Sequence, residues 1–137
     1  MFPIVIERPL VGKNGTNWPG LIILDPDAPL PAAIVAQEAW EAIYKLNPFT
    51  LLVTRLSRSA RRRMEIMGHE VEVQAAALIY GKVASAYRGA EARSMHAGYD
   101  GLFAGHSVIG IEAAMEAVSD EANRWVRRNL QKIERWK

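Results

Sequence analysis

Hydrophobic residues recur along the chain with two different periods, which predict a short β region followed by a longer helical one. Residues 4–7 and 21–24 are runs of mainly β-branched and aliphatic side chains, and glycine, asparagine and proline lie between them. Such runs, bounded by turn residues, are typical of β-strands. We therefore predict two strands joined by a polar loop, after which Asp25-Pro26-Asp27 ends the second strand and supplies a helix N-cap.

From residue 30 onward, apolar residues return every three or four positions, which is the period of an amphipathic helix. Asn47-Pro48 ends the first predicted helix, because the residue before a proline is disfavoured in the α region. An extended segment is expected from Phe49 to Thr54, and glycines end the second and third helices. The predicted helices cover residues 30–46, 57–80, 83–97 and 107–136.

Together these elements predict an α+β fold that is mostly helical, with short N-terminal strands followed by about four helices. A chain of 137 residues is long enough to bury a core in a single domain. Within that domain we distinguish a β element at 1–26, a helical core at 27–81 and C-terminal helices at 82–137.

Composition narrows the classes of protein to consider. Hydrophobic residues make up 50% of the chain and charged residues 23%, as in ordinary globular proteins. The chain has no cysteine, which excludes disulfides and thiolate metal sites and fits a cytoplasmic or virion-associated protein. No apolar run approaches the roughly 18 residues of a membrane span. The segment Met1–Glu7 has no basic region, so we expect no signal peptide.

The formal net charge is only +2, but the basic residues are clustered. Such clusters contact nucleic acid or acidic partners in some proteins and are solvated helix faces in many others. Both interpretations stay open from the sequence. The candidate polyanion-binding residues are Arg58, Arg61, Arg62, Arg63, Arg127 and Arg128.

Polar residues on two predicted helices are spaced to share faces. Gln37, Glu38 and Glu41 lie on one side of the first helix, at about 100° per residue. If the two helices face each other, their polar groups form a carboxylate-rich site that suits metal binding or acid/base chemistry. The second helix carries Glu65, His69 and Glu72 on one face, and Glu70 and Gln74 on another.

The order of these elements and residues resembles the zincins, metallopeptidases in which His-Glu-x-x-His on a helix holds zinc. The resemblance covers residues 20–85 and is to small zincin-like proteins of bacteriophages and prophages. It is carried by Ile34-Val35-Ala36-Gln37-Glu38-Ala39-Trp40-Glu41 and Gly68-His69-Glu70-Val71-Glu72-Val73-Gln74-Ala75. It implies that Gln37 and Glu41 stand at the two zinc-histidine positions and Glu38 at the general-base position. Glu70, with Gln74 beside it, or alternatively Glu72, would then be the third ligand.

The departures from the motif imply that peptidase chemistry has been lost, because glutamine and carboxylate are poor substitutes for two imidazoles on zinc. The resemblance then implies an inactive, zincin-like protein of phage type without a bound metal. Such a protein would act through protein partners or self-assembly, for example in a virion.

Two other functions stay open. Glu38, Glu41, His69 and Glu70 or Glu72 would bind a harder ion, such as Mn²⁺, Mg²⁺ or iron, in a working metal-dependent hydrolase. Alternatively, the arginine clusters would serve a nucleic-acid-associated protein. Trp40 and Tyr44, one turn apart on the first helix, are candidates for a partner surface.

Overall fold

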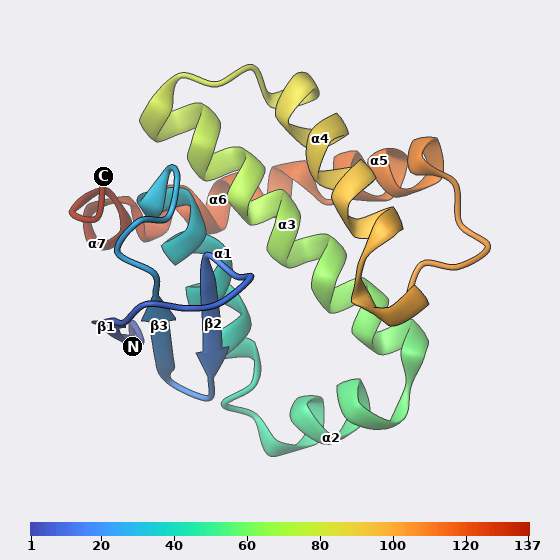
Figure 1. The fold of residues 1–137 in the computed structure, drawn as a ribbon, viewed down its shortest axis with the longest axis horizontal. Coiled ribbons are helices and arrows are strands. Elements are labelled where there is room, and N and C mark those ends of the chain that lie inside the picture. The colour runs from blue at the N-terminus through green and yellow to red at the C-terminus, as the bar shows by residue number, and fades with distance from the viewer.

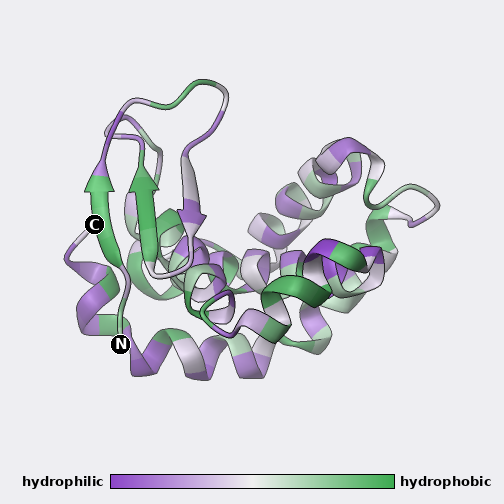
Figure 2. Cartoon of the chain, turned by 90° about the horizontal axis from the view of Figure 1, so that it is seen from below, coloured by the Kyte–Doolittle hydropathy of each residue, from purple (hydrophilic) through white to green (hydrophobic).

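The aliphatic runs near the N-terminus form part of a sheet in the computed structural model, which describes all residues from Met1 to Lys137 (Figure 1). β1 (Ile4–Glu7) pairs in parallel with β3 (Leu21–Leu24). The loop predicted between them contains a third strand, β2 (Gly15–Trp18), which pairs antiparallel with the other edge of β3. The sheet therefore has one strand more than the two that the sequence predicted. Figure 2 shows the reason, since two strands are hydrophobic along their length and the third is polar.

The rest of the chain is helical, which confirms the predicted α+β, mostly helical class. No helix is both long enough and apolar enough to cross a membrane. The first three predicted helices lie within two residues of their predicted bounds. The elements are α1 (Pro31–Tyr44), α2 (Pro48–Leu56), α3 (Arg58–Tyr80), α4 (Ala84–Ala97), the 3₁₀ turn η1 (Tyr99–Gly101), α5 (Val108–Ala117), α6 (Ser119–Arg128) and α7 (Leu130–Glu134).

The segment from Phe49 to Thr54 is helical, not extended as predicted. Asn47 caps α2, because its side-chain oxygen accepts a hydrogen bond from the Phe49 backbone N–H at 2.9 Å. Pro48 follows at the first helical position, where a proline costs no hydrogen bond. The Asn-Pro pair that ends α1 is thus also the start signal of the next helix.

The predicted N-cap at Asp25-Pro26-Asp27 is also wrong. α1 begins after Leu30, which has a left-handed backbone (φ 49°) and no side-chain cap. The Asp25 carboxylate instead accepts hydrogen bonds from the backbone N–H groups of Leu10 and Asp27, both at 2.8 Å. These bonds hold the pKa of Asp25 below its ordinary value and fix the loop that leads from β1.

The long final helix expected over 107–136 is broken into α5, α6 and α7. Asn129 marks the second break, where its side-chain amide donates to the Trp125 carbonyl at 2.9 Å and competes with the helical backbone. At the first break, Val118, the packing partners change. Ile111 and Met115 of α5 are buried in one apolar cluster, whereas Ala122 and Val126 of α6 are buried in another.

α3 is the central helix, and it crosses the middle of Figure 1. It packs against α1, α2, α4, α5 and α6. The polar faces of α1 and α3 are therefore brought together. Gly68 allows the close approach, because a Cβ there would lie 2.9 Å from Glu41 Oε1. The sheet covers the other side of α1, where Ile22 and Leu24 pack on Val35, Ala39 and Ala42.

Candidate metal centre

Two carboxylates of α1 meet the polar strand β2. Asn17 lies on this strand, and its side-chain amide nitrogen donates to Glu38 Oε2 at 2.5 Å and to Glu41 Oε2 at 2.7 Å. The Asn17 oxygen accepts a hydrogen bond from Lys45 Nζ at 2.8 Å. One asparagine thus holds both carboxylates side by side, with a lysine behind it.

His69 of α3 lies opposite these carboxylates, and its ring is held through Nε2. Tyr99 OH lies 2.5 Å from Nε2, and Gln37 Nε2 lies 3.3 Å from it. The Tyr99 hydroxyl stays protonated, because burial and the nearby Glu65 and Glu41 raise its pKa, so it is able to donate to Nε2 or to accept from it. The other ring nitrogen, Nδ1, lies 3.3 Å from Glu91 Oε2 of α4. Through its contact with Nε2, Gln37 positions the His69 ring.

Three of these side chains form a group of metal-ligand geometry. His69, Glu72 and Glu91 each place one ligand atom within 4.8 Å of the other two. Tyr87 of α4 donates to Glu72 Oε2 at 2.6 Å and orients that carboxylate. The three candidate ligands come from α3 and α4, and Tyr87 hydrogen-bonds to one of them. Protein metal sites usually have such outer hydrogen-bonding groups.

Two buried polar atoms in the cluster have no hydrogen-bond partner, Nδ1 of His69 and Oε1 of Glu41. His69 is 7% exposed and Glu41 4%. Leaving such an atom unsatisfied costs about 1–3 kcal/mol. A cation beside His69 Nδ1 would satisfy that nitrogen directly. The unpaired nitrogen therefore points to a cation independently of the cluster of carboxylates.

The cluster concentrates negative charge in a buried place. Burial raises the pKa of Glu38, and it raises the pKa values of Glu41 and Glu72 well above the ordinary carboxyl range. Neighbouring carboxylates add to the effect, Glu65 on Glu41 and Glu91 on Glu72. Burial alone would also raise the pKa of Glu91, but the neighbouring Glu72 carboxyl and the His69 ring, 3.3 Å away, outweigh it and lower that pKa. The buried carboxyl groups of Glu38, Glu41 and Glu72 are therefore harder to ionise than exposed ones, and a nearby cation would favour their ionised form.

We expect the metal-free protein to lose stability as the pH rises from 4.5, the ordinary carboxyl value, toward neutrality. A carboxyl whose pKa is raised on folding stabilises the fold fully below its unfolded value, 4.5, and that stability is lost as the pH passes its folded value. Thermal unfolding in chelator at several pH values measures the loss. Mn²⁺ should reduce the pH dependence, and a melting temperature that rises steadily over this range would contradict the expectation.

Glu70, the preferred third ligand in the sequence-based interpretation, points away from this cluster. Its two oxygens accept from Arg88 Nε and Nη2 at 2.8 and 2.7 Å, and Gln74 donates to Oε2 at 2.8 Å. Asn123 of α6 extends the network by donating to Gln74 at 3.0 Å. With both oxygens engaged by a guanidinium, Glu70 links α3 to α4 and α6, and Glu72 is the ligand candidate.

The structure therefore brings together five of the six residues that the sequence proposed as catalytic or metal-binding: Gln37, Glu38, Glu41, His69 and Glu72. Sequence reasoning did not select Glu91, Glu65 or Tyr99. Glu65 carried a signal, since it shares a helix face with His69. Tyr99 reaches the cluster from a strained turn, where Tyr99 and Asp100 have φ values of 57° and 51°, and such strain is frequent at functional sites.

The arginines predicted to bind polyanions are divided in the fold. Arg58 and Arg62 donate to the carbonyls of Gly101 and Leu102 at 3.0 and 3.2 Å, and so fasten α3 to the η1 region. Arg63 and Arg127 donate to Ser59 and Asn123 of their own helices, at 3.0 and 2.8 Å.

The predicted partner surface at Trp40 and Tyr44 is a stacked pair with ring centroids 5.1 Å apart. Trp40 is half-buried against the core between α1, α3 and α6. Its use by a partner stays a prediction.

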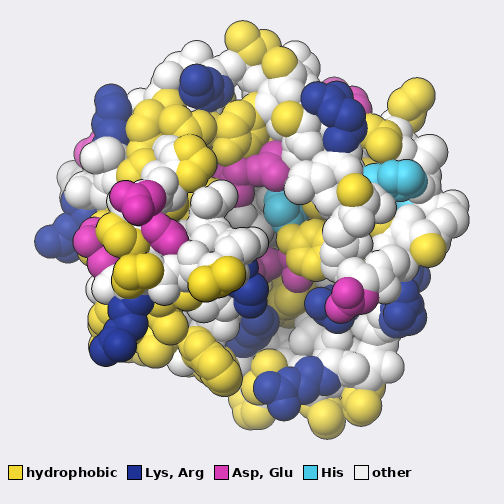
Figure 3. Space-filling model, in the orientation of Figure 1, with side chains coloured by type: hydrophobic (Ala, Val, Ile, Leu, Met, Phe, Trp, Pro, Cys, Tyr) yellow, Lys and Arg dark blue, Asp and Glu magenta, His cyan; other side chains and the backbone are white.

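The cluster is accessible from outside. Figure 3 shows acidic and histidine side chains at the bottom of a hollow in the middle of one face. A cleft of about 570 Å³ lies beside the cluster and is lined in part by Asn17, Lys45, Glu65 and Tyr99. The cleft therefore reaches the edge of the cluster, at Glu65 and at Tyr99, whose hydroxyl contacts His69.

No protein-family model, curated protein or solved structure matches the chain. The resemblance to zincins stays a prediction.

Proposed function

We propose that this protein is a divalent-metal-dependent hydrolase whose cation is held by His69, Glu72 and Glu91. The observation that carries the proposal is the convergence of these ligand atoms within 4.8 Å, beside a buried His69 nitrogen that has no hydrogen-bond partner. Carboxylates with one imidazole suit a fairly hard ion, and Mn²⁺ is the ion we expect.

Metal binding at Nδ1 fits the hydrogen bonds of His69. With a cation on Nδ1, the imidazole would carry its proton on Nε2. A hydroxyl both donates and accepts, so Tyr99 would accept from Nε2–H. Half a turn of the Gln37 amide would place its oxygen beside the same N–H. The groups that orient this histidine thus serve both states.

A cation at this place supplies hydrolytic chemistry, because it lowers the pKa of bound water toward neutrality. Glu38 stands at the general-base position implied by the zincin resemblance. Burial raises the pKa of this carboxyl, which brings it closer to the working pH of a base. The hydrogen bond from Asn17 to Oε2 holds the Glu38 carboxylate in place. The reaction class that these groups support is attack by metal-activated water.

The first test is the stoichiometry of Mn²⁺ bound to protein that has been stripped with chelator and then dialysed. We expect close to one Mn²⁺ per chain, and at least a tenfold loss of affinity in His69→Ala and in Glu91→Gln. His96→Ala is the matched control, because His96 is exposed at the end of α4. A wild-type chain without Mn²⁺, or equal binding in all variants, would overturn the site.

The hydrolase step is tested separately, by turnover of ester, phosphate-ester and peptide substrates with Mn²⁺ present. Glu38→Gln should retain Mn²⁺ and lose turnover by at least about 10². A protein that binds no metal and hydrolyses nothing would instead fit the inactive virion component that the zincin resemblance implies, which stays a prediction.

A further inference from the structure

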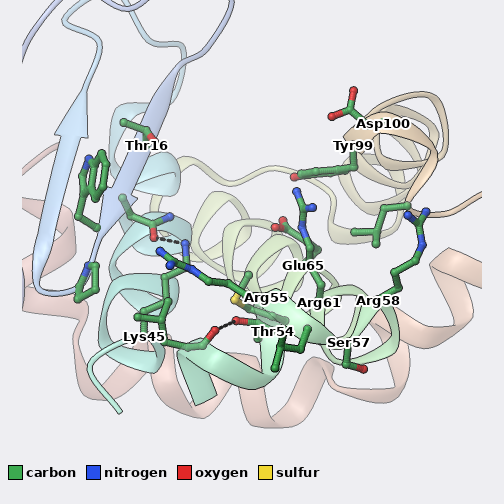
Figure 4. Close-up of a pocket in the computed structure, with 17 residues that line it drawn as sticks. Thr16, Lys45, Thr54, Arg55, Ser57, Arg58, Arg61, Glu65, Tyr99 and Asp100 are labelled. Carbon is green, nitrogen blue, oxygen red and sulfur yellow. Dashed lines mark hydrogen bonds between the residues drawn. The ribbon is translucent and has the colours of Figure 1, made fainter. Parts of the chain in front are cut away.

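The cleft beside the metal centre is lined with basic side chains from three different helices. Lys45 ends α1, Arg55 lies in the last turn of α2, and Arg58 and Arg61 lie at the start of α3. Only two acidic residues, Glu65 and Asp100, are among the 17 that line it. Figure 4 shows the arginines along the floor of the cleft, with Glu65 among them and Tyr99 above.

Of the four basic side chains in this cleft, Lys45 donates to Asn17 Oδ1 at 2.8 Å, and the three arginines are largely unpaired. Arg55 and Arg61 take part in no ion pair or side-chain hydrogen bond, and Arg58 donates only through Nη2 to the Gly101 carbonyl. Arg88, in contrast, is fully paired with Glu70. A solvated helix face would present its charges along one helix. Here separate elements turn their charges into one concave surface.

We propose that this cleft binds the phosphate group of a small phosphate ester, which is the substrate of the centre; this inference rests on the proposed hydrolase function. Guanidinium groups bind phosphate oxygens bidentately, and two or more match a dianion. A carboxylate-held Mn²⁺ or Mg²⁺ ion commonly takes phosphate oxygens as its remaining ligands. Glu65 lines the cleft and its Oε2 lies 3.8 Å from His69 Nε2, so the cleft adjoins the histidine of the centre.

The reaction that this geometry assigns is hydrolysis of the ester. The oxygen of metal-bound water forms a bond to phosphorus as the bond from phosphorus to the ester oxygen breaks. The proton of the water passes to the Glu38 carboxylate, and the leaving alkoxide takes a proton from solvent. One ester and one water thus give one phosphate and one alcohol, without oxidation or reduction. Arg55 and Arg61 stabilise the charge that develops on the phosphoryl oxygens.

The experiment measures binding of inorganic phosphate and hydrolysis of p-nitrophenyl phosphate by the Mn²⁺-loaded protein. We expect Arg55→Ala/Arg61→Ala to weaken phosphate binding at least tenfold while Mn²⁺ binding stays unchanged. The control is Arg93→Ala/Arg124→Ala, which removes two exposed arginines, one from α4 and one from α6, and should bind phosphate like the wild type. Hydrolysis of p-nitrophenyl phosphate should fall at least tenfold in Arg55→Ala/Arg61→Ala and stay unchanged in the control.

Other outcomes separate the two proposals. Mn²⁺ binding without phosphate binding, or an equal loss in both double variants, would overturn the phosphate cleft and leave the metal centre intact. Phosphate binding that depends on Arg55 and Arg61 in a chain that binds no Mn²⁺ would support the cleft and overturn the hydrolase. Tighter binding of succinate, or binding of a single-stranded oligonucleotide but not of phosphate, would overturn the assignment to a small phosphate ester.

Discussion

Replacement of Arg88 by methionine is expected to lower the free energy of unfolding by about 3–5 kcal/mol, because it strands a buried charge. Arg88 makes two hydrogen bonds with Glu70, whose side chain is fully buried. Breaking a buried pair from one side leaves the desolvation of the other charge uncompensated. Urea unfolding at pH 7 measures the change.

The double variant Arg88→Met/Glu70→Met separates a lost charge pair from lost packing. Since both charges are removed, we expect it to recover most of the stability lost in the single variant. Arg93→Met is the control, because Arg93 lies five residues further along α4 and is exposed. If the single variant loses less than about 1 kcal/mol, Glu70 is not the buried anion that the structure describes.

The substitution Glu72→Gln is expected to act in opposite directions on stability and on metal binding. Glutamine keeps the shape of the side chain and can still accept the hydrogen bond from Tyr87, but it removes a charge whose burial raises the Glu72 pKa well above its ordinary value. We expect the metal-free variant to be more stable than wild type by about 1–3 kcal/mol at pH 8. Its affinity for Mn²⁺ should fall at least tenfold, as in other sites that lose a ligand.

Urea unfolding in chelator and Mn²⁺ titration of the same preparations test both halves of this expectation. Glu134→Gln, an exposed carboxylate at the end of α7, should change neither quantity. A Glu72→Gln protein that is less stable in chelator would show that the carboxylate serves the fold. One that binds Mn²⁺ like wild type would show that Glu72 is no ligand.

The two carboxylates are thus expected to behave differently although they lie two residues apart on α3. Glu70 has a permanent counter-ion in Arg88, so its burial is compensated within the chain. Glu72 has only a tyrosine hydroxyl and the neighbouring Glu91 carboxylate. Groups that destabilise the fold in this way are typical of functional sites, where binding of a ligand restores the stability.

Local patterns predicted the elements in which sequence and packing agree. The long apolar stripe of α3 and the glycine after it gave its bounds to within one residue, and the same holds for α4. α2 and β2 were missed, because Asn47-Pro48 has two opposite meanings and because β2 is held by pairing with β3 and not by apolar side chains. The break at Val118 depends on which cluster each segment joins, whereas at Asn129 the side-chain amide competes with the helical backbone.

By itself, the sequence determined the fold class and which side chains share a helix face, because helical periodicity is a property of the chain alone. It therefore found Gln37, Glu38, Glu41, His69 and Glu72 as candidates. Only the tertiary structure decided that Glu70 turns to Arg88, that Glu91 and Tyr99 arrive from later elements, and that Arg55 and Arg61 line one cleft. These contacts join residues far apart in the chain, and their pairing depends on how the helices pack around α3.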